Sequence, residues 1–386
     1  MPGTAVAGRQ PKGYNRPLRV ALKRSTGEPG AIRGRFGGRF CAVADCQGTF
    51  TRENIVANYL VTGSAGFIGF HVAKKLLEEG HAIVGYDNLN PYYPPVLKRA
   101  RHERLREFDR FTPVEADLCD LETLGRVVES HKPDVVCHLA AQAGVRYSLT
   151  HPFVYGESNL HAFLNVLEVC RHAPLDRLVY ASSSSVYGGN RDLPFSEDDP
   201  VDHPISLYAA TKKANELMAH VYTHLYGLQT IGLRFFTVYG PWGRPDMAMW
   251  LFADAISRGR PIKVFNYGKM QRDFTYIDDI VSGVIAAIER DGLEPYEVLN
   301  LGNHRCEELM HLIELIEGEL GTEAEKEMLP MQPGDVPATY ADVERARRKL
   351  GYEPTTPIDI GVPKFIDWFK ARADLIEKVR HEQETD

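Results

Sequence analysis

The sequence predicts an α/β protein with a doubly wound parallel sheet, followed by a smaller α/β domain at the C-terminal end. Three observations favour this fold. Short apolar runs alternate with segments of helical periodicity from residue 58 onward, a glycine-rich turn joins the first run to the first helix, and four serines follow a later apolar run. Alternation of this kind is typical of parallel strands covered by helices on both faces.

The alternation is regular from residue 58 to about residue 240. The run 59–62 ends on Gly63 and is expected to be a buried strand, and the segment 67–79 has apolar residues at helical spacing and stops at Gly80. Further strands are expected at 82–86, 112–116, 135–139, 177–182 and 229–235, and further helices at 121–130, 153–170 and 207–226.

The C-terminal part differs in pattern, because beyond about Gly240 the strands and helices are less regular and proline is frequent. We therefore expect a first domain at 58–240 and a second, smaller domain at 241–386. Part of 275–301 is expected to return and pack on the first sheet. Such a division fits a chain of 386 residues.

The composition is that of a soluble globular protein, with 44% hydrophobic and 25% charged residues and a net charge of −7. A nucleic-acid partner is not expected, because phosphate contacts require clustered Lys and Arg. A membrane span is not expected either, since no apolar run reaches the length of about 18 residues that a span needs. Six cysteines without close pairs indicate reduced thiols, no metal site and a cytoplasmic location.

The N-terminal segment has a different charge from the rest of the chain. Residues 1–52 contain ten Lys and Arg against two acids, Glu28 and Asp45. Residues 1–57 are expected to form a basic, disordered extension. A targeting segment and a basic nucleic-acid arm are the alternatives, although the segment has glycine and proline throughout and little amphipathic periodicity.

A glycine-rich turn follows the first expected strand. Gly63 permits a tight turn, Gly66 lets the backbone approach a pyrophosphate at the helix N-terminus, and Gly69 lets the helix lie close to the sheet. The pattern alone is weak evidence, but its position between a strand and a helix favours a Rossmann-type dinucleotide site.

An acidic residue, Asp87, ends the second expected strand, where it can accept hydrogen bonds from ribose hydroxyls and repel a 2′-phosphate. This favours NAD over NADP. Alternatively, Asp87 caps the loop that follows, and Asp117 is equally suited to hold the adenine edge or to cap a helix. The full set of residues expected at the cofactor, besides Tyr208 and Lys212, is Gly63, Gly66, Phe67, Ile68, Gly69, Asp87, Asn88, Asp117, Leu118, Leu139, Ala140 and Ala141.

The candidate catalytic residues are Tyr208 and Lys212, which share one face of an expected helix through their i, i+4 spacing. A nearby ammonium is expected to lower the pKa of the phenol and make it a usable general base. The serines after the strand at 177–182 lie where such sheets bind ligands, and Ser183, then Ser184, is expected to share a proton with Tyr208. The alternatives are a solvated helix face and an ordinary polar strand end.

These motifs, in this order, resemble the extended short-chain dehydrogenase/reductase superfamily from residue 58 to about residue 369, which includes the NAD-dependent epimerase/dehydratase family. Within it the chain resembles UDP-glucuronate 4-epimerases through segments 85–93, 140–148, 236–247, 268–279 and 331–335. Residues 1–57 have no counterpart there. The resemblance implies that NAD stays bound and is recycled, that Tyr208 removes the proton of the sugar 4-hydroxyl, and that a 4-keto sugar forms and rotates. It also implies a homodimer.

The resemblance also implies the substrate contacts. Thr237 and Arg244 match residues that contact the uronate carboxylate, and Arg146 is a weaker candidate for that contact. The nucleotide contacts are expected from Arg272 at the diphosphate, Phe265 stacked on uracil, and Gln332 and Asp335. For the arginines the alternative is a surface ion pair.

The nearest alternative activities are those of a UDP-glucuronate decarboxylase, a nucleotide-sugar 4,6-dehydratase and a UDP-glucose 4-epimerase. The two lyases carry acidic residues just after the catalytic hydroxyl, whereas this chain has Ser184 and Ser185 there. Arg244 favours a charged sugar over glucose. A catalytically silent NAD-binding regulator is a further alternative, which the intact Ser, Tyr and Lys set disfavours.

Overall fold

The computed structural model describes residues 43–44, 50–51 and 56–385. Most of the N-terminal segment for which we expect disorder lies outside these residues. Within it, β1 (Val43–Ala44) and β2 (Phe50–Thr51) form an antiparallel pair. In the described part of the chain, no helix is both long and apolar enough to cross a membrane.

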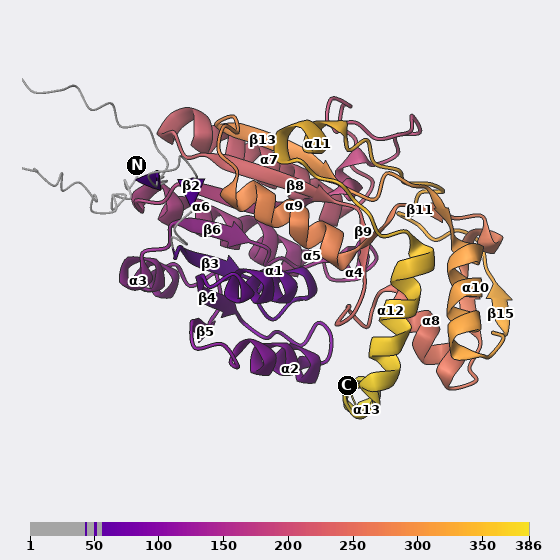
Figure 1. Cartoon of the computed structure of the whole chain (residues 1–386). Coiled ribbons are helices and arrows are strands. Elements are labelled where there is room, and N and C mark those ends of the chain that lie inside the picture. Colours follow the sequence, from indigo (N-terminus) through magenta and orange to yellow (C-terminus); the bar gives the residue numbers. More distant parts are fainter. Residues whose placement is uncertain (1–42, 45–49, 52–55, 386) are drawn as a thin grey trace, which may run out of the picture. The chain divides into compact units, whose positions relative to one another are not determined.

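The centre of the structure is a seven-stranded parallel sheet with the order β13-β8-β7-β6-β3-β4-β5 (Figure 1). Its strands are β3 (Asn58–Thr62), β4 (Ala82–Asp87), β5 (Phe111–Glu115), β6 (Val135–His138), β7 (Arg177–Ser183), β8 (Thr230–Phe235) and β13 (Tyr296–Leu301). The chain reverses its direction of winding after β5, when it returns to place β6 on the other side of β3. The Rossmann-type doubly wound fold is thereby confirmed.

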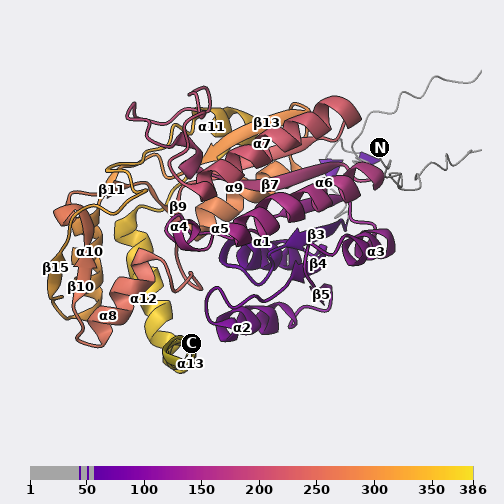
Figure 2. The same cartoon turned by 180° about the vertical axis from the view of Figure 1, so that it is seen from behind.

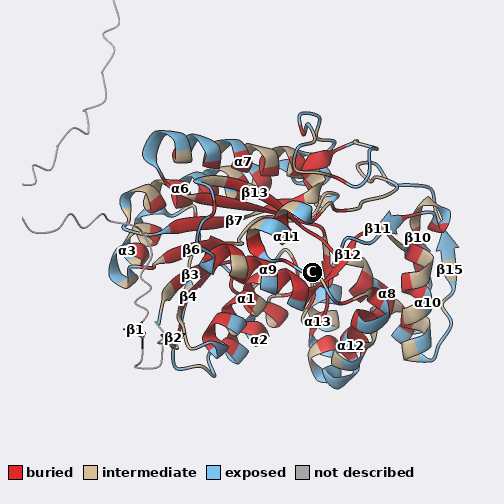
Figure 3. Ribbon diagram, turned by 45° about the horizontal axis from the view of Figure 1, so that its top comes forward, coloured by how far each residue is buried: buried red, intermediate tan, exposed pale blue. Residues whose placement is uncertain are grey.

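Helices cover both faces of this sheet (Figures 1 and 2). One apolar core includes Val61 of β3 and Phe70 of α1 (Phe67–Glu78), whereas the other includes Leu60 of β3 and Phe163. Adjacent residues of β3 thus belong to different cores, as expected for a strand buried on both faces. Figure 3 shows the buried residues along the central strands, between the two helical layers.

The helices that connect the strands from β3 to β8 lie on the two faces of the sheet (Figures 1 and 2). Besides α1, they are α2 (Pro95–Leu105), α3 (Leu121–His131), α5 (Pro152–Tyr155), α6 (Ala162–His172) and α7 (Leu207–Tyr226), with the short α4 (Tyr147–Thr150). Helix α2 is absent from the sequence-based expectation. Its buried side chains are Leu97, Lys98, Arg101, His102 and Leu105. Polar residues thus interrupt the apolar stripe of its inner face and leave only a weak periodic signal.

The single helix expected at 153–170 is wrong in detail, because a π-helical segment, η1 (Gly156–His161), separates α5 from α6. The wide turn places Asn159 in the interior. There its Oδ1 accepts from the Gln142 amide at 2.8 Å, and its Nδ2 donates to the Thr211 hydroxyl at 3.0 Å. Wide turns of this kind are common at functional sites.

The chain after β8 forms the remaining elements. They are β9 (Thr237–Tyr239), α8 (Ala248–Ser257), β10 (Ile262–Val264), η3 (Phe265–Gly268), β11 (Gln271–Arg272), β12 (Phe274–Tyr276), α9 (Ile277–Glu289), β14 (Glu307–Glu308), α10 (Leu309–Leu320), β15 (Lys326–Met328), α11 (Glu344–Leu350), α12 (Ile358–Ala371) and α13 (Ala373–Thr385). β13 pairs with β8 throughout its length, so this strand belongs to the main sheet. The division of the chain into domains at about Gly240 stays a prediction.

Candidate functional site

A cavity of about 1230 Å³ lies at the carboxyl ends of the central strands. Every residue assigned to the site from sequence contributes to its lining, with the exception of Gln332. Such a position is where open parallel sheets bind their ligands. The Gln332 Oε1 is buried and has no hydrogen-bond partner among the described residues.

The glycine turn packs too closely for any side chain. Gly63 has a φ of +71°, which glycine adopts without strain. A Cβ atom on Gly69 would lie 2.1 Å from the Gly63 carbonyl oxygen, and one on Gly63 would lie 2.7 Å from the Ala140 amide nitrogen. Helix α1 begins after Gly66 with no side-chain cap, so its N-terminus can bind an anion.

Asp87, the last residue of β4, binds both the glycine turn and the loop that follows β4. Its Oδ2 accepts from the Ala65 amide at 3.0 Å, and its Oδ1 accepts from the Leu89 amide at 2.9 Å. The loop-capping alternative is therefore observed. Asp117 likewise accepts from the Cys119 amide at 2.8 Å and from Asn88 at 2.9 Å. Both carboxylates also line the cavity, which leaves a ligand contact open to each.

Tyr208 is the second residue of α7, whose N-cap Ser206 accepts from the Ala209 amide. Contrary to our expectation, the pKa of its phenol is raised, because burial outweighs the opposing effects of a hydrogen bond with Ser183 and the charge of Arg244. Lys212 is not among the groups that shift this pKa, and its Nζ donates to the Ala181 carbonyl at 3.0 Å. Burial lowers the pKa of Lys212 to about 8.

The serine run turns directly from β7 into a short 3-10 helix, η2 (Ser184–Tyr187). Ser183 ends the strand and caps this helix, because its Oγ accepts from the Ser185 amide at 3.2 Å. Ser183 is buried, and Ser184 lies at the start of the 3-10 helix. Both line the cavity together with Tyr208 and Lys212, so the structure brings these four residues together.

Arg244 is held by an acidic partner that our sequence reading did not assign. Its Nε donates to Asp246 Oδ1 at 3.0 Å, and its Nη2 donates to Asp246 Oδ2. The Tyr92 hydroxyl donates to the same carboxylate at 3.0 Å. Burial lowers the pKa of Arg244, but the charge and hydrogen bonds of Asp246 raise it by more. The spacing of Arg244 and Asp246, two residues apart, was the only sequence signal for this pairing.

The other arginines of the cavity differ in their partners. Arg146 forms an ion pair with Asp335 at 3.1 Å, and its guanidinium lies 5.0 Å from the centre of the Phe265 ring. Arg272 donates to the carbonyls of Gln271 and Pro337 at 2.8 and 3.2 Å. Its pKa is lowered by burial, and in the described part of the chain no carboxylate lies within ion-pair distance of it. Arg272 is therefore the arginine best suited to an anionic ligand.

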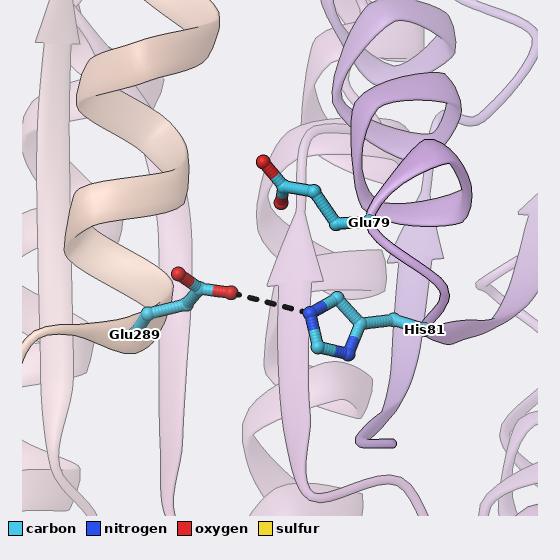
Figure 4. A group of neighbouring side chains, drawn as sticks. All are labelled: Glu79, His81 and Glu289. Carbon is cyan, nitrogen blue, oxygen red and sulfur yellow. Dashed lines mark ion pairs between the residues drawn. The ribbon is translucent and has the colours of Figure 1, made fainter. Parts of the chain in front are cut away.

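A second group of possible ligands, Glu79, His81 and Glu289, lies outside the cavity (Figure 4). The His81 Nδ1 accepts from the Ala57 amide at 3.3 Å, and its Nε2 lies 3.5 Å from Glu289. Because the Ala57 amide occupies Nδ1 and Nε2 faces Glu289, these contacts account for the cluster without a metal ion.

The chain belongs to the NAD dependent epimerase/dehydratase family, whose model matches residues 59–302. It is 53% identical to an uncharacterised protein of Methanocaldococcus jannaschii, over 83% of this chain and 98% of that one. It is 47% identical to a probable UDP-glucuronate 4-epimerase of Rhizobium meliloti, over 81% and 96% of the two chains.

The fold is also similar to solved structures of this kind. A UDP-glucuronic acid 4-epimerase of Bacillus cereus, in complex with UDP-glucuronic acid and NAD, matches with a TM-score of 0.77 and 36% identity, over 81% of this chain and 99% of that one. A Tyr-to-Phe mutant of that enzyme, in complex with UDP-4-deoxy-4-fluoro-glucuronic acid and NAD, matches with the same TM-score.

Proposed function

We propose that the protein interconverts UDP-glucuronate and UDP-galacturonate by inverting C4 of the sugar, with NAD as a resident cofactor. The observation that carries this proposal is the single cavity that contains the glycine turn, Tyr208 with Ser183, and Arg244. A dinucleotide, an acid/base pair and a cation for a sugar carboxylate then meet at one place. The relatives named above support the same reaction.

The residues present fit NAD. The uncapped N-terminus of α1 and the close approach at Gly69 leave room for a pyrophosphate beside the backbone. Asp87 is suited to the adenosine ribose and disfavours a 2′-phosphate. The remaining contacts come from Asp117 and the end of β6. When bound, NAD accepts a hydride from C4 and returns it.

Tyr208 is the general base for the 4-hydroxyl proton and the acid that returns it. The raised pKa of Tyr208 favours the protonated form, so the phenolate depends on charges that the bound ligands bring to the cavity. Lys212 retains its charge at neutral pH despite a pKa lowered to about 8. Ser183 hydrogen-bonds to Tyr208 and orients the phenol hydroxyl for proton transfer to and from the sugar 4-hydroxyl.

The 4-keto form of a uronic acid is a β-keto acid, which loses carbon dioxide when its carboxylate stands perpendicular to the ketone plane. Arg244 and Thr237 hold the carboxylate away from this arrangement. Arg244 lines the cavity, and its guanidinium can form charge-assisted hydrogen bonds with a carboxylate in competition with its pairing to Asp246. Arg272 binds the diphosphate, and Phe265, Arg146, Gln332 and Asp335 lie towards the nucleotide.

The test is incubation of the purified protein with UDP-glucuronate without added NAD, followed by proton NMR. The proposal expects UDP-galacturonate to accumulate to equilibrium. UDP-pentose in its place would contradict the proposal in favour of a decarboxylase. A protein that contains NAD but produces no turnover would instead be a silent NAD-binding regulator.

We also propose a cytoplasmic homodimer that pairs through α5 and α7. Leu217, Val221 and Leu225 recur at every fourth residue of α7 and are 56, 46 and 60% exposed, and Phe153 of the adjoining α5 is 86% exposed. An exposed apolar face of this kind is typical of an interface. The four cysteines in the described chain are free, as in a reducing compartment.

Light scattering on size-exclusion fractions tests the interface. The wild type is expected at twice the chain mass, and Leu217→Glu with Leu225→Glu is expected at the mass of one chain. Leu121→Glu is the matched control, since Leu121 is also exposed but lies on α3. A monomeric wild type, or a double variant that remains dimeric, would refute this assignment.

A further inference from the structure

The turn 240–243 leads directly to Arg244, and side chains of α1 and α2 bind its backbone carbonyls. The Pro241 carbonyl lies 2.9 Å from His71 Nε2 of α1. The Trp242 and Gly243 carbonyls accept from Arg101 Nη2 of α2 at 2.6 and 3.1 Å. Three successive carbonyls of the turn therefore bind side chains of α1 and α2.

Arg101 also holds the glycine turn. Its Nη1 donates to the Ala65 carbonyl at 2.8 Å and to the Tyr93 hydroxyl at 2.7 Å. Its side chain is fully buried, and no carboxylate of residues 56–385 lies within ion-pair distance of it. A buried cation without an ionic partner is costly. Through Nη1 and Nη2, Arg101 connects the glycine turn to the turn before Arg244. An apolar side chain would fill the same space without the cost of burying a charge, so the hydrogen bonds are the distinctive contribution of Arg101.

The backbone of this turn requires such support. Trp242 has a φ of +60°, a left-handed conformation that is strained for a bulky residue. Its ring packs against Phe70 of α1 at 5.4 Å and against Trp368 of α12 at 5.5 Å between centroids. The strained conformation is held through both the side chain and the carbonyl of Trp242, and Arg244 follows two residues later.

We propose that Arg101 is a positioning residue for sugar recognition, which fixes the turn 240–243 and hence Arg244 relative to the glycine turn. This inference rests on the role of Arg244 in the proposed function. Arg101 does not touch the substrate in this scheme; it acts through Arg244. Misplacement of a binding group by about 1 Å can lower a rate by about a hundredfold, so loss of Arg101 should affect the charged sugar most.

The variants Arg101→Met and Arg101→Lys test the proposal, with Arg99→Met as control. Arg99 lies on the same helix but is exposed. We expect Arg101→Met to lower kcat/KM for UDP-glucuronate by about 10- to 100-fold, while the affinity for UDP-glucose as a competing ligand changes less than about threefold. Lysine keeps the charge but lacks the fork, so Arg101→Lys should give an intermediate loss. Arg99→Met should resemble the wild type.

A double-mutant cycle with Arg244→Met shows whether Arg101 acts through Arg244. In the Arg244→Met background, replacing Arg101 by Lys should cost less than about twofold in the preference for uronate over neutral sugar. A full additional loss would overturn the proposal. So would equal losses for UDP-glucuronate and UDP-glucose in Arg101→Lys, which indicate a merely structural role and remain measurable if Arg101→Met fails to fold.

Failure of the proposed function gives a different result. If Arg244→Met alone leaves the preference for UDP-glucuronate unchanged, the assigned role of Arg244 is wrong, and the positioning role of Arg101 is overturned with it. If Arg244→Met abolishes that preference while both Arg101 variants retain it, only the inference about Arg101 is overturned.

Discussion

Two parts of the cavity lining are built in different ways. The glycine-turn lining, Gly63, Gly66, Gly69 and Asp87, lies within one strand–helix–strand unit. Close backbone contacts fix the glycines, and the Asp87 carboxylate accepts from two backbone amides. The arginine lining, Arg146, Arg244 and Arg272 with Asp246 and Asp335, comes from segments far apart in the chain. The first is fixed by sterics, whereas the second is a set of charges that are partly paired with one another. A rigid glycine-turn lining suits a cofactor that stays bound. An arginine lining whose ion pairs can be exchanged for contacts with a ligand suits a substrate that binds and leaves.

The largest expected effect concerns Tyr208, which lines the same cavity as both sets of residues. Tyr208→Phe removes the proton-carrying hydroxyl and should lower turnover by about 10²- to 10⁴-fold, while bound NAD is retained. Turnover is measured by NMR, and NAD is measured after release from the denatured protein. Tyr226→Phe, near the far end of α7, is the control. Unchanged turnover in Tyr208→Phe would refute the assigned role.

The next largest effect concerns the glycine-turn lining. The methyl group of Gly69→Ala would lie 2.1 Å from the Gly63 carbonyl oxygen, so the turn must open and NAD should be lost on purification. Gly125→Ala makes the same change within α3, where nothing lies within 4 Å. It should stabilise the protein by about 0.5–1 kcal/mol. If Gly69→Ala retains NAD as Gly125→Ala does, this lining is not fixed by sterics.

The sequence predicted the structure well where the apolar pattern lies within a single helix or strand. Helix α7 and the strands of the sheet follow the expected ranges closely, because apolar periodicity reports burial directly. It failed at α2, whose inner face mixes polar and apolar residues, and at the pairing of Arg244 with Asp246 and Tyr92. The raised pKa of Tyr208 was missed for a related reason, since the burial that raises it depends on tertiary packing.

A smaller effect tests whether pairing weakens the arginine lining. Asp246→Asn removes a negative charge beside Arg244 while keeping the side-chain shape. We expect the preference for UDP-glucuronate over UDP-glucose in binding to rise about three- to tenfold, or about 1 kcal/mol. Calorimetry in the Tyr208→Phe background measures it without turnover. Asp198→Asn is the control, because Asp198 pairs with Arg345 away from the cavity. A reduced preference would mean that Asp246 mainly orients Arg244 rather than attenuating its charge.

The last expected effect is on stability rather than on turnover or ligand binding, and it is a pH dependence that originates at Lys212. Its pKa is lowered from 10.5 to about 8 by burial, so between these values the unfolded chain binds more protons than the folded one. The free energy of unfolding therefore rises with pH across this window, because deprotonation removes a buried charge. Below pH 8 the cost of burying the ammonium is present in full.

Lys212→Met lacks this ionisation and should lack the rise. The measurement is urea unfolding of nucleotide-free wild type and Lys212→Met between pH 7 and about pH 10, a range that spans the folded pKa and most of the interval up to the unfolded value. The difference between the two curves isolates Lys212 from the other titrating groups. A difference that is constant with pH would mean that the Ala181 carbonyl compensates the charge of Lys212 fully. In that case Lys212 would resemble the arginine lining, whose charges are paired, rather than the glycine-turn lining, which is fixed by sterics.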